Sequence, residues 1–258
     1  ATRTATCCAS SRTASMRPAS KTIEFIEADL TQPLQPSILP SRCDGVVHLA
    51  QCERFNEFPE GAREVFAVNV AAPMALLDWA RGAGVGAFVH ASSGGLYGGG
   101  AEPLTEDDAL NFGGRLAYYL STKRATELLA SAYQDQFAVS ALRFFFIYGA
   151  RQRANMLMPR LVSSVRDGRA LTLQGESGMA LNPVHVSDAA AAAVGAMRSG
   201  KSGLYNVGGP ETLRIRDIGE AIGQLLGRAP RFEQAAGAPK DLVGDITRMR
   251  TDLHQPTI

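Results

Sequence analysis

The sequence predicts an α/β fold, a doubly wound parallel sheet with a small C-terminal lobe. Three observations support this prediction. From residue 21 to about residue 150, short apolar runs typical of buried parallel strands alternate with amphipathic helical stretches. The chain has 258 residues, 45% of them hydrophobic, which suits one such domain. After Gly149 the alternation becomes less regular, as expected for a smaller appended lobe.

The individual elements are predicted from hydrophobic periodicity. Strands are predicted at residues 22–28, 45–50, 86–91, 139–145 and 204–207. Helices are predicted at residues 63–81, 115–137, 156–166, 187–197 and 215–226. Glycines at 82 and 84 end the first helix, Gly227 ends the last, and Ser187 is a plausible N-cap of the fourth.

Residues 1–20 differ from the rest of the chain. They are mostly Ala, Thr, Ser and Arg, with no acidic residue, and they lack the apolar side chains of a core strand or an amphipathic helix. Three interpretations remain open. The segment is a disordered tail, an Arg- and Ser-rich targeting peptide, or a truncated or mis-framed start.

Composition excludes several classes of function. The formal net charge of +1 gives no basic surplus for nucleic acid and no acidic tail. The longest apolar stretches, such as residues 189–197, are too short to cross a bilayer. Cys7, Cys8, Cys43 and Cys52 form neither a zinc pattern nor an obvious disulfide framework. We therefore expect a cytoplasmic protein with no metal site and no nucleic-acid or membrane partner.

A tyrosine and a lysine stand four residues apart in the predicted helix 115–137, as Tyr119 and Lys123. On a helix this spacing puts the phenol and the ammonium on one face. A nearby ammonium favours phenolate over phenol and lowers the tyrosine pKa toward working pH. The pair could then act as general acid or base in an alcohol–ketone interconversion. Taken alone, the same spacing usually gives a solvated surface pair.

Two serines, Ser92 and Ser93, follow the predicted buried strand 86–91 and precede a glycine-rich turn. Hydroxyls at the carboxyl end of a parallel strand lie where α/β sheets bind ligands. Ser93 could hydrogen-bond the reacting oxygen and hold it against Tyr119. The alternative is an ordinary Ser/Gly turn.

Further motifs complete an ordered series. They are Asp29-Leu30, VHLA at 47–50, VNV at 68–70, RFFFIYG at 143–149, NPVHVSD at 182–188, YNVGG at 205–209 and DITRMR at 245–250. With the serine turn and the Tyr119/Lys123 helix, the series resembles the extended short-chain dehydrogenases/reductases, the NAD-dependent epimerase/dehydratase family. The resemblance covers roughly residues 22–250. It implies a Rossmann-like cofactor domain, residues 21–150 with 187–200, and a substrate-binding lobe, residues 151–258.

The resemblance also implies roles for the matching residues. Ser93 and Tyr119 would handle the substrate hydroxyl, and Lys123 would bind the nicotinamide ribose of NAD or NADP. The resemblance also implies that Asp29 and Leu30 flank the adenine and that Leu49 and Ala50 line the middle of the cofactor. Asn69 would lie on the cofactor side of its helix. The implied substrate contacts are Ser92, Phe146 and Arg151. For Asn69 and Asp29 a purely structural hydrogen bond is the alternative, and His185 and Asp188 are expected to be structural.

The sequence departs from the family at its start. No glycine-rich phosphate-binding turn precedes residue 22, and the residue that would choose NAD or NADP is missing as well. We interpret the sheet as incomplete at its N-terminus. Either residues 22–28 pair directly with residues 45–50, or they keep their family place and leave an apolar edge that favours dimers or aggregates.

Other departures narrow the reaction. Gly94 and Gly95 stand where related sugar dehydratases carry an Asp-Glu pair, so the acid needed for dehydration is missing. Three positions that usually contact a nucleotide diphosphate are apolar, as Phe146, Leu181 and Ala238. Arg151, Arg153 and Arg160 could replace those donors. We therefore expect nucleotide-diphosphate sugars to bind poorly relative to smaller hydroxylated compounds.

The sequence thus predicts an NAD(P)-dependent epimerase or oxidoreductase. It would act on a secondary alcohol of a sugar or sugar-like substrate by hydride transfer, with a tyrosine as acid/base. The alternative is a catalytically inactive homologue or fragment that binds no cofactor. The expected partners are a small-molecule substrate and, as a candidate, a second copy of the chain in a homodimer.

Overall fold

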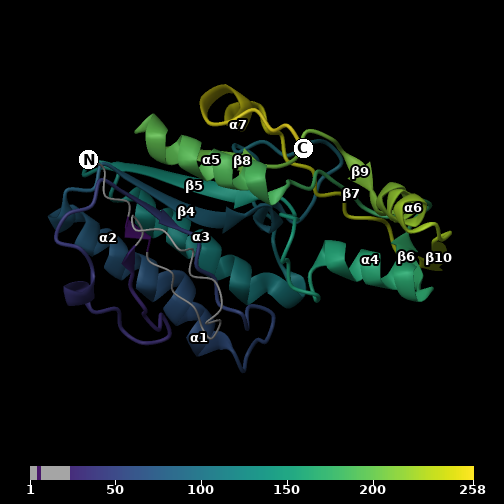
Figure 1. Cartoon of the computed structure of the whole chain (residues 1–258), viewed down its shortest axis with the longest axis horizontal. Helices are drawn as coiled ribbons and strands as arrows, with labels where there is room; N and C mark the ends of the chain where they lie inside the picture. Colours follow the sequence, from purple (N-terminus) through teal and green to yellow (C-terminus); the bar gives the residue numbers. More distant parts are fainter. Residues whose placement is uncertain (1–4, 7–23) are drawn as a thin grey trace. The chain divides into compact units, whose positions relative to one another are not determined.

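The computed structural model describes residues 5–6 and 24–258, which fall into two compact units (Figure 1). Unit 1 comprises Ala1–Ser92, Phe112–Leu142 and Ala196–Leu204. Unit 2 comprises Ser93–Asn111, Arg143–Gly195 and Tyr205–Ile258. The predicted limits of the cofactor domain and the lobe stay a prediction.

A four-stranded sheet forms the centre of the fold. Its order is β3 (Gly45–His48), β4 (Ala87–Ser93), β5 (Ala138–Phe144) and β8 (Gly203–Val207). β3 and β4 run parallel, with Val47 opposite Val89 and His48 opposite His90. Helical segments lie between successive strands in the sequence, as parallel crossovers require. The predicted α/β fold with a parallel central sheet is confirmed.

The helices of unit 1 follow the predicted pattern with two differences. α1 (Ala62–Phe66) and α2 (Ala72–Ala83) are joined by a π-helical turn, Ala67–Ala71, which was not predicted. α3 (Ala117–Ser131) ends earlier than the predicted residue 137. The prediction was wrong there because tight turns take over after Ser131, and they bring the amide of Ala138 to the carbonyl of Gly86 at 3.1 Å.

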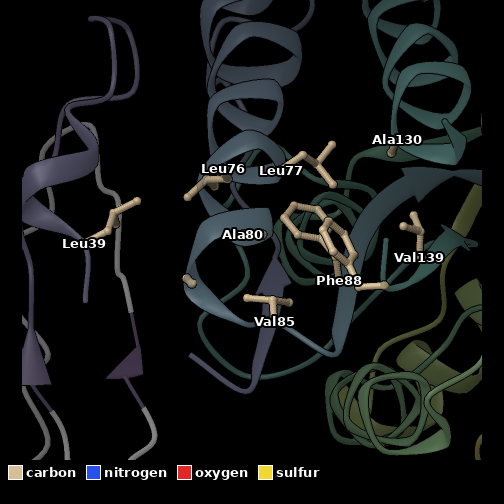
Figure 2. Close-up of a cluster of buried hydrophobic side chains, with 10 residues drawn as sticks. Leu39, Leu76, Leu77, Ala80, Val85, Phe88, Ala130 and Val139 are labelled. Atoms are coloured by element: carbon tan, nitrogen blue, oxygen red, sulfur yellow. The ribbon is translucent and has the colours of Figure 1, made fainter. Parts of the chain in front are cut away.

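The core of unit 1 lies where α2 and α3 cover one face of the sheet (Figure 2). Leu76, Leu77 and Ala80 come from α2, Ala130 comes from α3, and Phe88 and Val139 come from β4 and β5. Leu77 and Phe88 are fully buried and lie close together in Figure 2. Because side chains alternate along a strand, the face of β4 that carries Phe88 also carries His90 and Ser92. The same face is therefore apolar at one end and polar at the other.

The N-terminal strands pair with each other. β1 (Ala5–Thr6) runs parallel to β2 (Glu24–Phe25) in a separate two-stranded sheet. Residues 5 and 6 belong to the segment that is predicted to lack a core strand, and their strand is only two residues long and lies outside the four-stranded sheet. Such pairing needs main-chain amides and carbonyls rather than large side chains. Within the described residues β2 pairs with β1 and β3 pairs with β4, so direct pairing of residues 22–28 with 45–50 is not observed. The rest of residues 1–20 lies outside the described residues.

Unit 2 contains most of the remaining elements. In chain order they are α4 (Leu157–Asp167), β6 (Ala170–Gln174), β7 (Ala180–Leu181), α5 (Val186–Ser199), β9 (Leu213–Arg214), α6 (Ile215–Leu226), β10 (Arg231–Ala235) and α7 (Thr247–Asp252). β6 and β10 pair in parallel, and β7 and β9 pair antiparallel. Leu161, Leu171 and Ile218 bring α4, β6 and α6 into one apolar cluster. None of the described helices is long and apolar enough to cross a bilayer.

3-10 turns occur at Pro36–Ile38, Gly94–Tyr97 and Gly114–Leu116. Gly84 and Gly227 adopt the left-handed conformation after α2 and α6, as predicted for helix-ending glycines. The prediction of Ser187 as an N-cap was wrong: α5 begins at Val186, because the amide of Ala189 already donates to the carbonyl of His185.

Candidate active site

Tyr119 and Lys123 lie one turn apart in the first half of α3, as their spacing predicts. Both side chains are buried, and Lys123 Nζ lies 5.8 Å from the centroid of the Tyr119 ring. The Tyr119 hydroxyl donates to Gln51 Oε1 at 3.0 Å, and the ring contacts Phe55 with centroids 5.3 Å apart. The solvated surface pair that this spacing often gives is therefore not what α3 contains.

Lys123 is hydrogen-bonded to β4, the strand that ends in Ser92 and Ser93. Its Nζ donates to the carbonyl oxygen of Ala91 in β4 at 3.0 Å. Only 4% of the residue is exposed. Burial lowers the pKa of Lys123 to about 8, and the negative charge of Glu127 opposes that shift. The side chain is therefore an ammonium below about pH 8 and supplies positive charge beside the phenol.

Ser92 faces the interior of unit 1. Its Oγ donates to Glu127 Oε1 at 2.6 Å, and both residues are buried. The second carboxylate oxygen, Oε2, accepts from Arg124 at 3.0 Å. The Ser92 hydroxyl proton is thus directed at α3, which assigns the side chain a supporting position, and its predicted contact with substrate stays a prediction.

Asn69 lies in the π-helical turn and links three segments. Its Oδ1 accepts from the amide of Cys52, and its Nδ2 donates to Thr122 Oγ1. Four residues later stands Pro73, which has no amide hydrogen to give the Asn69 carbonyl its usual helical bond. Thr126 Oγ1 replaces that donor at 2.6 Å. The side chain therefore makes structural bonds here, and its predicted contact with the cofactor stays a prediction.

Replacing Thr126 by valine is expected to lower the free energy of unfolding by about 1–3 kcal/mol. Valine keeps the shape but leaves the buried Asn69 carbonyl without its hydroxyl donor. Thr126→Ser keeps the donor and is expected to lose much less. Urea unfolding of the two variants checks this, and equal losses would show that volume rather than the hydrogen bond matters.

Two histidines, His48 and His90, lie on the neighbouring strands β3 and β4. His48 and His90 are partners in the parallel register of β3 and β4, and His90 is 1% exposed. Among the described residues, neither ring nitrogen of His90 has a hydrogen-bond partner. Burial, with the charge of Lys123 adding to it, lowers the pKa of His48 to about 3, and burial is the main cause that lowers that of His90 to about 4. Both rings are therefore neutral at pH 7.

The other implied cofactor contacts of unit 1 have varied surroundings. The Asp29 carboxylate accepts from the amide and the hydroxyl of Thr31, which lowers its pKa. Leu30 is buried in an apolar cluster, and Ala50 packs against the same cluster. Leu49 is 53% exposed at the carboxyl end of β3. An exposed leucine at a strand end fits a ligand contact, whereas the Leu30 side chain also serves the core.

Three of the sequence-predicted residues belong to unit 2. Ser93 ends β4, and its Oγ accepts from the amide of Gly95 at 3.2 Å. That bond uses an oxygen lone pair and not the hydroxyl proton, which is the atom that the predicted role needs. Phe146 and Arg151 have positive φ angles, 48° and 68°, which non-glycine residues seldom adopt. The predicted approach of Ser93 to Tyr119 and the predicted substrate contacts stay predictions.

The model of the NAD dependent epimerase/dehydratase family matches residues 2–208. The chain belongs to this family.

Among its relatives is YtcB of Bacillus subtilis, an uncharacterized UDP-glucose epimerase, which is 28% identical over 72% of this chain and 60% of its own length. A UDP-glucuronate 4-epimerase of Thermodesulfobacterium geofontis is 25% identical over 83% of this chain and 67% of its own length. The chain thus spans about 60–67% of these curated relatives. The solved UDP-glucuronic acid 4-epimerase of Bacillus cereus, in complex with NAD, matches with a TM-score of 0.81 and 25% identity, covering 93% of this chain and 78% of that one.

Several residues around Tyr119 and Lys123 were missed by sequence reasoning. They are Gln51, Glu127, Thr122, Thr126, His48 and His90. Glu127 had a usable signal, because it stands one helical turn after Lys123 on the same face. The two histidines also had one, since each is a polar residue inside an apolar run predicted to be a buried strand. Gln51 gave no signal, because a lone glutamine in a loop has no periodicity or spacing to mark it.

Proposed function

We propose that this chain catalyses NAD-dependent hydride transfer at a secondary alcohol of a sugar or sugar-like substrate, as an epimerase or a dehydrogenase. The observation that carries the proposal is the Tyr119 phenol one helical turn from the buried Lys123 ammonium, which is anchored on β4. Family membership and the NAD in the related Bacillus cereus epimerase support the choice of reaction and cofactor.

The residues present fit a nicotinamide cofactor. The Lys123 ammonium carries three hydrogens and donates one of them to the Ala91 carbonyl. Others can therefore donate to ribose hydroxyls. The exposed Leu49 offers an apolar surface, and the exposed Asp29 carboxylate offers a hydrogen-bond acceptor. We infer that Lys123 holds the ribose and that Asp29 and Leu30 flank the adenine. Leu49 and Ala50 line the middle of the cofactor, and Asn69 lies on the cofactor side of its helix. The bound cofactor supplies a hydride acceptor at the nicotinamide C4.

Proton transfer is the work of Tyr119. As phenolate it takes the proton of the substrate hydroxyl while the carbinol carbon gives up its hydride, and a ketone results. Lys123 favours the phenolate through its positive charge. Ser93 is proposed to hold the substrate oxygen by donating its hydroxyl proton. Return of the hydride to the opposite face of the ketone gives an epimer, and release of the ketone gives a dehydrogenase.

The turn after β4 argues against dehydration. A Cβ atom added to Gly94 would lie 2.7 Å from the ring of Phe145, far closer than atoms can approach. Phe145 is 1% exposed and stacks on Tyr97, so it has little freedom to move away. An acidic side chain therefore does not fit at Gly94, and the proposal is restricted to oxidation–reduction without loss of water.

The proposal is tested by titrating the chain with NADH and NADPH while cofactor fluorescence is recorded. Reduction of NAD⁺ to NADH in the presence of hydroxylated sugars is then followed by absorbance, and epimer formation by NMR. We expect saturable NADH binding that Lys123→Met weakens. Absence of saturable binding by both cofactors, with the chain folded, would overturn the proposal.

Nucleotide-diphosphate sugars are expected to bind more weakly than smaller hydroxylated compounds. Leu181 is fully buried and Phe146 packs against the same apolar cluster, so neither gives the diphosphate a hydrogen-bond donor. Phe146→Asn is expected to raise the affinity for a UDP-sugar about tenfold, because a bond to a charged group contributes about 1.5–3 kcal/mol. Calorimetric titration measures this, with Phe146→Leu as the apolar control. Micromolar binding of a UDP-sugar by the unaltered chain would refute the expectation.

A further inference from the structure

The strongest unassigned feature of unit 1 is the buried carboxylate of Glu127. It stands one turn after Lys123 on α3 and is as deeply buried as the lysine. Its Oε1 accepts a short hydrogen bond from Ser92, in the same strand whose Ala91 carbonyl holds the lysine. One strand therefore fixes both charged groups of one helix face.

We propose that Glu127 is a positioning residue that keeps Lys123 charged: the carboxylate, fixed by the Ser92 hydroxyl, is the counter-charge of the buried ammonium. This inference rests on the proposed function, since it matters because the ammonium holds the ribose and sustains the phenolate of Tyr119. Glu127 acts through Lys123 and touches neither substrate nor cofactor.

The balance of charges around Lys123 shows why a counter-charge is needed. Burial of an ammonium without a negative partner is unfavourable, and lysine then tends to lose its proton instead. Among the residues that the structure describes, the titratable groups that face Lys123 are His48 from β3, His90 from β4, and Tyr119 and Glu127 from α3 itself. The two histidines are neutral at pH 7 and Tyr119 is neutral until it gives up its proton. Glu127 is therefore the one negative charge among them.

The Ser92 bond supplies the geometry for this role. Glutamate side chains have several rotatable bonds, and Arg124, which is partly exposed, donates to the other carboxylate oxygen. The 2.6 Å bond to Ser92 holds Oε1 inside, against β4. Without it, one of the bonds that hold the carboxylate beside β4 is lost, and its position relative to Lys123 is less well fixed.

The charge of Lys123 is directly measurable, because the chain contains four lysines, at 21, 123, 201 and 240. The ligand-free chain is labelled with ¹³C-lysine, and the Cε signals are followed by NMR as the pH is raised. The Lys123 signal is assigned by its loss in Lys123→Arg. Glu127→Gln removes the charge while its amide oxygen still accepts from Ser92. Glu64→Gln is the matched control, because Glu64 is a partly exposed glutamate that also pairs with an arginine.

We expect the midpoint for Lys123 to fall by about one pH unit or more in Glu127→Gln. It should fall by a smaller amount in Ser92→Ala and stay unchanged in Glu64→Gln. NADH affinity at pH 8 should weaken in Glu127→Gln and recover toward pH 6.5. An unchanged midpoint in folded Glu127→Gln overturns the proposal, and should that variant fail to fold, an unchanged midpoint in Ser92→Ala does so. The titration needs no turnover, so its failure is distinct from failure of the proposed function.

Discussion

Replacing Tyr119 by phenylalanine is expected to lower kcat by roughly two to four orders of magnitude, the usual contribution of a positioned acid or base. The ring and its contact with Phe55 are retained, and only the hydroxyl that donates to Gln51 is lost. Folding and cofactor affinity should therefore change little. Lys123→Met removes the ammonium, so it should weaken NADH binding and also lower turnover.

The adjacent tyrosine offers a matched control. Tyr118 is on the same helix, and its hydroxyl donates to the carbonyl of Ala62 at 3.0 Å, a structural bond between α3 and α1. Tyr118→Phe should reduce stability slightly and leave kcat within a few-fold. Steady-state kinetics with the substrate found for the unaltered chain measures both variants. Near-normal turnover in Tyr119→Phe, or equal losses in the two, would rule out the proton-transfer role.

The centre of the candidate site was predictable from the sequence because its signals are local. The spacing of Tyr119 and Lys123 fixes their shared helix face, and the apolar run before Ser92 fixes a buried strand that ends in hydroxyls. Neither inference needs knowledge of distant contacts. Local signals of this kind survive in any fold that forms the helix and the strand.

What the sequence did not predict depends on pairs that are far apart along the chain. The Ser92–Glu127 and Asn69–Thr122 bonds join residues 35 and 53 positions apart, which no periodicity marks. β10 contains one large apolar residue, Phe232, and is a strand because it pairs with β6, about 60 residues away. The π-helical turn had a local signal that was overlooked, since Pro73 removes an amide hydrogen inside a helical pattern.

Acid is expected to destabilise the chain steeply between pH 6.5 and pH 4, because two histidines are buried in their neutral form. The folded pKa values of His48 and His90, about 3 and about 4, lie below the unfolded value near 6.5. Below pH 6.5 the unfolded chain therefore binds protons that the folded chain does not. Stability rises with pH wherever the unfolded state binds more protons, so it falls as the pH is lowered through this window.

The size of the effect follows from the shifts. At about 1.4 kcal/mol per pH unit, each histidine lowers the free energy of unfolding by about 2–3 kcal/mol when the pH falls to 4.5. The pair lowers it by about 5 kcal/mol. That is a large part of the stability of an ordinary domain, which is about 5–15 kcal/mol. Urea unfolding at pH 7 and pH 4.5 measures it. Carboxylates also titrate in this range, so the histidine contribution is read from the difference between variants.

His90→Leu isolates one of the two rings. Leucine is close to imidazole in volume and removes two ring nitrogens that have no partner among the described residues. The free energy of unfolding of the variant should therefore be higher by about 1 kcal/mol or more at pH 7, since a buried unsatisfied polar group costs about 1–3 kcal/mol. At pH 4.5 the gain should grow by a further 2–3 kcal/mol or so.

Phe88→Leu, two residues earlier on the same face of β4, changes packing without removing a titrating group. It should shift stability equally at both pH values. If His90→Leu also shifted stability equally at both values, then His90 would be protonated in the folded chain, and the polar end of this core would hold a charge that Glu127 must also balance.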